Sequence, residues 1–348
     1  MKQNLIYTIG LILLFTACSR KEFVVPEPQI YQFAVPSNFP RPDFDTESPL
    51  TKEGIELGRM LFYDLRLSGN NKVSCASCHD QKLAFSDGKA LNDAGVSGTI
   101  LHRHTPALIN LAWANNGLFW DGGATNLESQ AFGPLTATDE MHQDLFELAG
   151  ELSAVPEYVK RFDLVFKDQV SSQNIVKALA QFQRTLVSAN SRYDKFKRNE
   201  AGGNLSSVEL QGLQLVRQKC QSCHAGELFT DNGYHNNGID ADFSNDKYEG
   251  LFQGRFRISY NAADLGSFKT PTLRNVALTA PYMHDGRFAE LEDVLDHYSG
   301  EIKISATLDS NIPANGFQFN SDEKKAILAF LKTLTDEEFI TNSEFSKP

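Results

Sequence analysis

The sequence lacks an excess of positive charge, and it has few cysteines. Its 33 Lys and Arg against 44 Asp and Glu give a net charge of −11, so the broad attraction that drives nucleic-acid binding is absent. Five cysteines are an odd number, which does not fit a simple disulfide framework. With 41% apolar and 22% charged residues, the composition also excludes a disordered, collagenous or polytopic membrane protein.

The N-terminus carries an export signal. Lys2 precedes an apolar run at 5–15, which is too short to span a bilayer but typical of a signal peptide. The run leads into Ala17 and Cys18 and resembles a bacterial lipobox, so we expect a signal peptide at 1–17 and a lipid anchor on Cys18. An ordinary cleaved signal peptide is the alternative. Either way we expect an exported protein of the periplasm or cell envelope. A lipid on Cys18 would be its only contact with the membrane.

Residues 18–49 are rich in proline and predict an extended tether without a core of its own.

The remaining chain repeats itself. The pattern C-x-x-C-H occurs at 75–79 and at 220–224, each time after a helical pattern, and residues 178–186 align with 326–334 as amphipathic helices. Alternating strand patterns are scarce. At about 150 residues per domain, 348 residues suggest two domains. We therefore predict an all-α protein with cytochrome c-like domains at 50–195 and 203–340.

Two cysteines followed directly by a histidine are the attachment signature of c-type haem. The cysteines form thioethers to the vinyl groups, and the adjacent imidazole reaches the iron as proximal ligand. The sequence thus predicts two covalent haems, held by Cys75, Cys78, His79, Cys220, Cys223 and His224. A zinc site with four thiolates and a redox disulfide are the alternatives. Zinc explains neither the two histidines nor a helical unit around each pair.

Several short motifs point to one family. They are Phe119-Trp120-Asp121-Gly122, Gln130, Gly133-Pro134, Asp139-Glu140-Met141, the run 270–275 (TPTLRN) and the run 279–286 (TAPYMHDG). Together and in this order they resemble the bacterial dihaem cytochrome c peroxidases, including the MauG-like branch, over essentially all of residues 50–335.

The resemblance implies a peroxidatic first haem and an electron-transfer second haem. Glu140 matches the distal acid and base that moves a proton between the oxygens of peroxide, which is general acid–base work. Gln130 matches a polar group of the distal pocket, and Pro134 a residue that shapes it. Trp120 matches the indole between the two haems. Arg274 contacts a haem propionate or forms a surface salt bridge; both readings stay open.

The chain departs from the peroxidases at two positions, one that ligates the resting first haem and one that helps to bind calcium. The position of the histidine that caps the resting first haem holds Val96, so that haem is expected to rest five-coordinate or with water. His104 replaces an Asn of the family's calcium site. The carbonyls matching Thr279 and Pro281 could still serve, so a calcium ion stays open.

On the second haem, Tyr298 falls on the position of the peroxidases' Met ligand, as in MauG-like proteins. We favour Tyr298 over Met283, with His297 third. His142, His235 and His284 are expected to be surface or structural residues.

The leading hypothesis for function is reduction of hydrogen peroxide, with electrons from a small cytochrome c or copper protein. MauG-like oxidation of a protein or organic substrate is the alternative. A plain electron-transfer cytochrome is a third, but it needs neither Glu140 nor Gln130.

Overall fold

The computed structural model describes residues 27–43 and 49–348. The predicted signal peptide and Cys18 lie outside the described residues, so both stay predictions. Among the described helices, none is long and apolar enough to cross a membrane.

Helices make up nearly all of the regular secondary structure of the described residues, as expected for the predicted class. The helices are α1 (Lys52–Phe62), α2 (Leu127–Thr136), α3 (Leu145–Ser153), α4 (Pro156–Phe166), α5 (Ser172–Arg184), α6 (Arg192–Lys197), α7 (Ser207–Lys219), α8 (Lys247–Gly250), α9 (Phe256–Ser259), α10 (Leu291–Gly300), α11 (Ser321–Lys332) and α12 (Glu337–Thr341). Strand β1 (Tyr234–His235) pairs antiparallel with β2 (Phe268–Lys269), with Tyr234 opposite Lys269. Long irregular segments and short 3-10 turns connect them.

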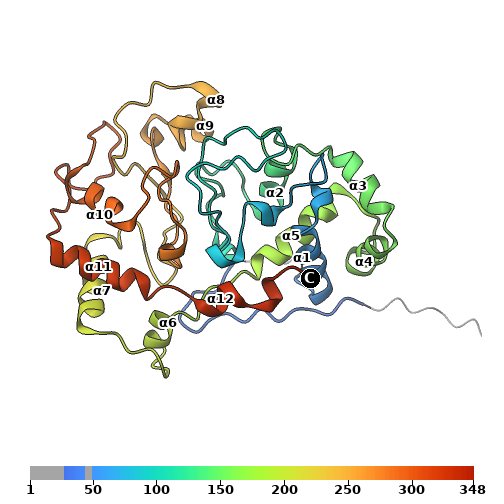
Figure 1. Cartoon of the computed structure of the whole chain (residues 1–348), viewed down its shortest axis with the longest axis horizontal. Coiled ribbons are helices and arrows are strands. Elements are labelled where there is room, and N and C mark those ends of the chain that lie inside the picture. The colour runs from blue at the N-terminus through green and yellow to red at the C-terminus, as the bar shows by residue number, and fades with distance from the viewer. Residues whose placement is uncertain (1–26, 44–48) are drawn as a thin grey trace, which may run out of the picture.

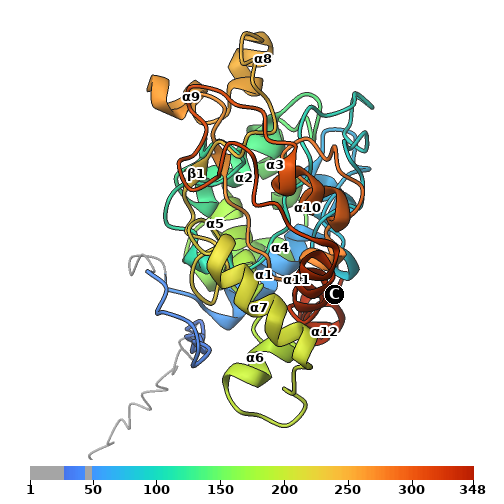
Figure 2. The same ribbon diagram turned by 90° about the vertical axis from the view of Figure 1, so that its left-hand side faces the viewer.

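The internal repeat is visible as two helix pairs, α1 with α5 and α7 with α11 (Figures 1 and 2). A β-carbon on Gly58 would overlap the carbonyl oxygen of Ala178, and one on Gly212 would overlap that of Ala326. Ala178 and Ala326 are equivalent in the aligned segments. The same backbone-to-backbone contact, which only glycine permits, thus holds both pairs together.

The repeat begins with two capped helices. The Thr51 side chain accepts a hydrogen bond from the amide of Gly54 at the start of α1. Ser206 and Glu209 form the capping box expected for α7, each side chain bonding the other's backbone amide. Local sequence therefore determines where these two helices begin.

Two hydrophobic cores follow the two helix pairs, but their boundaries differ from those predicted. Tyr193 of α6 packs in the second core, although the first domain was expected to extend to residue 195. Phe339 and Phe345 pack in the first core, although the second domain was expected to extend to residue 340. Phe339 and Phe345 pack there because the chain after α11 returns to the first domain, where α12 lies near α1 (Figure 1).

Residues 27–43, part of the expected tether, lie against the body of the protein. The ring of Phe39 packs edge-on against Trp113 of the first domain at 5.2 Å, and the guanidinium of Arg274 in the second domain lies 4.4 Å from its centre. Pro40 accepts a hydrogen bond from the Trp113 indole. The segment forms no helix and turns at 37–38, and its aromatic residue joins a small core between the domains, where an extended tether was expected.

Candidate active site

The first C-x-x-C-H lies on a 3-10 turn at Cys75–Ser77. Nδ1 of His79 lies 2.8 Å from the carbonyl oxygen of Phe85, which places the ring proton on that nitrogen. Burial lowers the pKa of His79, so the imidazole stays neutral. Nε2 is therefore left unprotonated, as a metal ligand requires.

The second C-x-x-C-H repeats this arrangement. Nδ1 of His224 lies 3.2 Å from the carbonyl oxygen of Phe229, and burial again lowers the pKa of the imidazole. Phe85 and Phe229 both have left-handed backbones, with φ of 61° and 52°. Such strain in bulky residues persists where the surroundings impose it, often at functional sites. The two halves thus orient the histidine of each C-x-x-C-H motif through the same kind of hydrogen bond.

The four cysteines described are unpaired. Burial raises the pKa of Cys75 and Cys220 to about 12 and that of Cys78 to about 11. A redox-active cysteine needs a lowered pKa, so these thiols do not favour the disulfide alternative. Over residues 27–43 and 49–348, the only cluster of possible metal ligands is Cys223, His235 and Asp309. The four thiols do not converge, which is evidence against zinc.

The second motif opens into an apolar cavity. Its wall includes Cys220, Cys223, His224, Asn237, Phe268, Met283, Leu295, Tyr298, Phe317, Phe319 and Leu331. One neutral imidazole at an apolar cavity wall, with two thiols beside it, is the environment that a covalent haem requires. The residues that line this cavity therefore fit a covalently bound haem.

Tyr298 and Met283, the two favoured candidates for the further axial ligand of the second haem, both lie in the wall of this cavity. Asn237 donates from Nδ2 to the Tyr298 hydroxyl at 3.3 Å and to the Met283 sulfur at 3.5 Å. Burial raises the pKa of Tyr298 to about 12, although the Asn237 bond lowers it. His297 does not line the cavity, and its Nε2 lies 3.0 Å from the Asn237 carbonyl. The choice is therefore between Tyr298 and Met283, and Asn237 is a residue that no sequence signal identified.

A second cavity lies between the domains. It is lined by residues of the first domain from His104 to Trp120, by Gln130, and by second-domain residues from Lys269 to Met283. Trp120 belongs to the walls of both cavities, and its indole donates to the carbonyl of His104 at 2.8 Å. Trp120 therefore lies where the walls of the two cavities meet, and its place between two haems stays a prediction.

Glu140 is not in the wall of the interdomain cavity, so the structure does not bring it together with Gln130 there. It lies close enough to the thiols of Cys75 and Cys78 for its charge to raise their pKa values. Burial, reinforced by the charge of Asp139, raises the pKa of Glu140 to about 7. Glu140 is thus a carboxyl near the first motif that holds and releases a proton around neutral pH.

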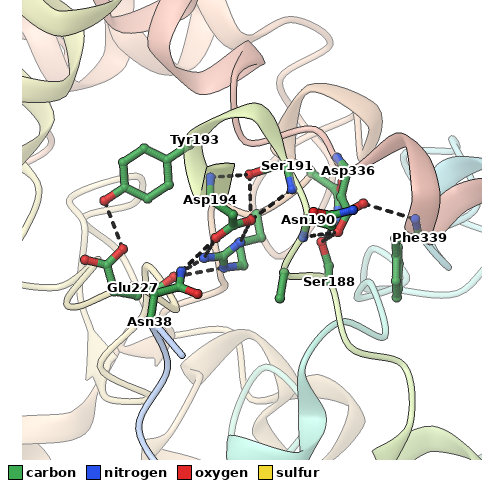
Figure 3. A network of polar contacts seen from close by, with 12 residues as sticks. Asn38, Ser188, Asn190, Ser191, Tyr193, Asp194, Glu227, Asp336 and Phe339 are labelled. Carbon is green, nitrogen blue, oxygen red and sulfur yellow. Dashed lines mark hydrogen bonds and ion pairs between the residues drawn. The ribbon is translucent and has the colours of Figure 1, made fainter. Parts of the chain in front are cut away.

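Arg274 forms a salt bridge, but a buried one. Its guanidinium pairs with Asp194 through two bonds of 2.8 Å and also donates to the carbonyl of Glu227. Both side chains of the pair are fully buried. Figure 3 shows Asp194 and Glu227 within the surrounding network of polar contacts. The structure corrects the expectation of a surface pair, and contact of Arg274 with a haem propionate stays a prediction.

The groups considered for calcium line one cavity. His104, Thr279 and Pro281 all belong to the interdomain wall. His104 bonds the Lys89 carbonyl through Nδ1 at 2.8 Å. The calcium ion itself stays a prediction.

The remaining histidines are structural or exposed. His284 is buried, and its ring stacks on Phe268 at 3.6 Å; burial lowers its pKa to about 4. His235 lies between Asp231 and Asp309. His142 is exposed.

Comparison with known proteins shows the family to which the chain belongs. A family model described as di-haem cytochrome c peroxidase matches residues 52–202. The methylamine utilization protein MauG of Methylorubrum extorquens is 37% identical over 312 residues, covering 88% of this chain and 84% of that protein. Cytochrome c551 peroxidase of Nitrosomonas europaea is 34% identical over 307 residues, covering 87% and 86%.

Solved structures agree with these sequence matches. The crystal structure of a MauG-like protein associated with microbial copper homeostasis has a TM-score of 0.83 and 34% identity, covering 91% of this chain and 99% of that one. The diheme peroxidase BthA from Burkholderia thailandensis has a TM-score of 0.69 at 23% identity, covering 92% and 94%, and supports the fold alone. This chain therefore belongs to the di-haem cytochrome c peroxidase family, which includes both MauG proteins and cytochrome c peroxidases.

Proposed function

We propose that this protein reduces hydrogen peroxide to water with two electrons and two protons, H₂O₂ + 2e⁻ + 2H⁺ → 2H₂O. Cys75, Cys78 and His79 would hold the first haem, and Cys220, Cys223 and His224 the second. The haem irons supply the redox chemistry and the position where peroxide is reduced. Electrons from a small cytochrome c or copper protein would enter at the second domain and pass Trp120 to reach the first.

Glu140 carries this proposal. A pKa of about 7 means that the carboxylate and the carboxylic acid coexist at neutral pH. The carboxylate can take the proton from one peroxide oxygen, and the acid can return it to the other, so that hydroxide need not leave. A cytochrome that only transfers electrons has no use for such a group near the C-x-x-C-H motif.

Glu140→Gln tests the proposal. It keeps the size of the side chain and removes the proton acceptor. We expect both haems to remain and the reaction with peroxide, followed by stopped-flow absorbance, to slow by about 10²-fold or more. Glu151→Gln, which changes an exposed carboxyl on α3, is the control and should react at the parent rate. If Glu140→Gln also reacts at the parent rate, Glu140 is not the acid and base.

A second candidate function is MauG-like oxidation of a protein or organic substrate. It is favoured by Tyr298 in the second cavity wall, because a phenolate ligand stabilises oxidised iron. Turnover with reduced cytochrome c distinguishes the two. Rapid oxidation of the cytochrome by peroxide supports the peroxidase, whereas its absence favours the alternative.

We also infer that the protein is exported and held at the membrane through Cys18. Cys18→Ser should move the protein from the membrane fraction to the soluble periplasmic fraction. An unchanged distribution would exclude a lipid anchor at this residue.

A further inference from the structure

A buried carboxylate follows Trp120 directly. Asp121 is 1% exposed, and one of its oxygens, Oδ2, bonds both Nη1 of Arg103 at 2.9 Å and Nη1 of Arg257 at 2.8 Å. Its other oxygen accepts from the amide of Gly123 at 3.0 Å. Burial opposes ionisation of Asp121, but the two arginines outweigh it and lower the pKa. The carboxylate therefore joins three segments of the chain as an anion.

These segments include both domains. Arg103 lies in the first domain, whereas Arg257 belongs to α9, in the irregular region that connects β1 with β2 at the top of Figure 1. Arg255 of the same region donates to the carbonyls of Asp121 and Gly122 at 3.0 and 3.2 Å. The turn that carries Trp120 is thus bonded to the second domain through the side chain of Asp121 and through the backbone carbonyls of Asp121 and Gly122.

The same contacts fix the indole. Arg103 precedes His104, whose carbonyl accepts the Trp120 indole N–H. The Trp120 carbonyl in turn accepts from the Lys269 amide of β2 at 2.7 Å. Arg103 bonds Asp121, and the Trp120 carbonyl belongs to the peptide bond that joins Trp120 to Asp121. Moving Asp121 would therefore disturb both hydrogen bonds that anchor Trp120.

A gain in folding stability does not by itself explain why Asp121, Arg103 and Arg257 lie together. Buried ion pairs are often no more stabilising than apolar residues of the same size. Within the part of the chain that the structure describes, Nε of Arg103 is also a buried donor without a hydrogen-bond partner. An unsatisfied buried group calls for an explanation, and holding a precise geometry is one.

We propose that Asp121, bridged by Arg103 and Arg257, is a positioning residue that holds Trp120 between the two haems and so sets the rate of electron transfer between them. This inference rests on the proposed function for the relay through Trp120, and it adds the groups that keep the relay in place. It does not depend on what the first haem reduces.

The test is a one-electron measurement on the haem-loaded protein without peroxide. A photoreductant delivers one electron to the fully oxidised protein, and absorbance follows its redistribution between the haems. In Asp121→Asn we expect redistribution to slow by about 10-fold to about 10²-fold, since displacements near 1 Å cost up to about 10²-fold in reactions that depend on geometry. The spectra and potentials of the two haems should remain those of the parent.

Controls separate positioning from general damage. Asp64→Asn removes another carboxylate, partly buried, which bonds Arg66 and Tyr158 in the first domain, and should leave redistribution unchanged. Arg257→Gln should slow redistribution as Asp121→Asn does, and Arg257→Lys should restore part of the rate by keeping the charge. Arg257 is partly exposed, so its variants provide the test if Asp121→Asn fails to fold.

Parent rates in Asp121→Asn or Arg257→Gln would overturn the inference, as would equal slowing in Asp64→Asn. A wild-type protein that does not reduce peroxide would refute the proposed peroxidase activity. The redistribution measurement contains no peroxide, so it would still decide the role of Asp121.

Discussion

Replacing Glu140 by Gln should stabilise the folded protein at alkaline pH while it slows the reaction with peroxide. The carboxyl has a usual pKa of 4.5, and burial together with Asp139 raises it to about 7. Below pH 4.5 the group is neutral in both the folded and the unfolded chain, so it costs nothing. As the pH rises from 4.5 through 7, the unfolded chain releases its proton first, and the folded state loses stability.

The size of this effect follows from the pKa. A change from 4.5 to about 7 corresponds to about 3 kcal/mol at pH 8, at about 1.4 kcal/mol for each tenfold change in acidity. Gln has the same shape and no charge, so it avoids this cost. For a domain of this size, about 3 kcal/mol corresponds to a rise in Tm of about 6–12 °C.

The assay is thermal unfolding of the haem-loaded protein, followed by circular dichroism at pH 4, 6 and 8. Glu140→Gln should unfold at the parent temperature at pH 4 and at a higher one at pH 8. Asp139→Asn removes only the smaller cause of the shift and should give a smaller gain in the same direction. A Glu140→Gln protein with the same gain at all three pH values, or with a loss at pH 8, would refute the reasoning.

The remaining predictions concern the cofactors, the second haem and the helix pairs. The mature protein made with haem-maturation machinery should exceed its polypeptide mass by two haem groups, and a colourless zinc protein would end this interpretation. Tyr298→Phe should change the axial ligation of the second haem in electron paramagnetic resonance and raise its potential, whereas Met283→Leu should leave both nearly unchanged; the reverse would assign the ligand to Met283. Gly58→Ala and Gly212→Ala should each lower the free energy of unfolding by about 1–3 kcal/mol, because a β-carbon would overlap a backbone carbonyl. Gly150→Ala on α3, where a β-carbon meets nothing within 4 Å, is their control and should stabilise by up to about 1 kcal/mol.

Local chemistry was readable from the sequence because it needs only neighbouring residues. The motifs expected to attach a haem and to supply its proximal ligand each span only five positions, at 75–79 and at 220–224. The caps at Thr51 and Ser206 act within one helical turn, and the structure has both. The equivalence of 178–186 and 326–334 predicted two matching helices, and the structure has them in α5 and α11. That α1 and α7 pack on them through Gly58 and Gly212 is known only from the structure.

Other features depend on residues that are far apart in the chain, and only the tertiary structure decided them. Arg274 pairs with Asp194, 80 positions away, so no local pattern distinguished a buried pair from a surface one. Phe339 was assigned to the second domain by its position, yet it packs in the first core because the chain returns there. The pKa of Glu140 depends on how deeply the fold buries its carboxyl group, and a short sequence motif does not reveal how buried a residue is. Asp121 is adjacent to Trp120 in the sequence, but the arginines that give it a role converge on it only in the folded chain.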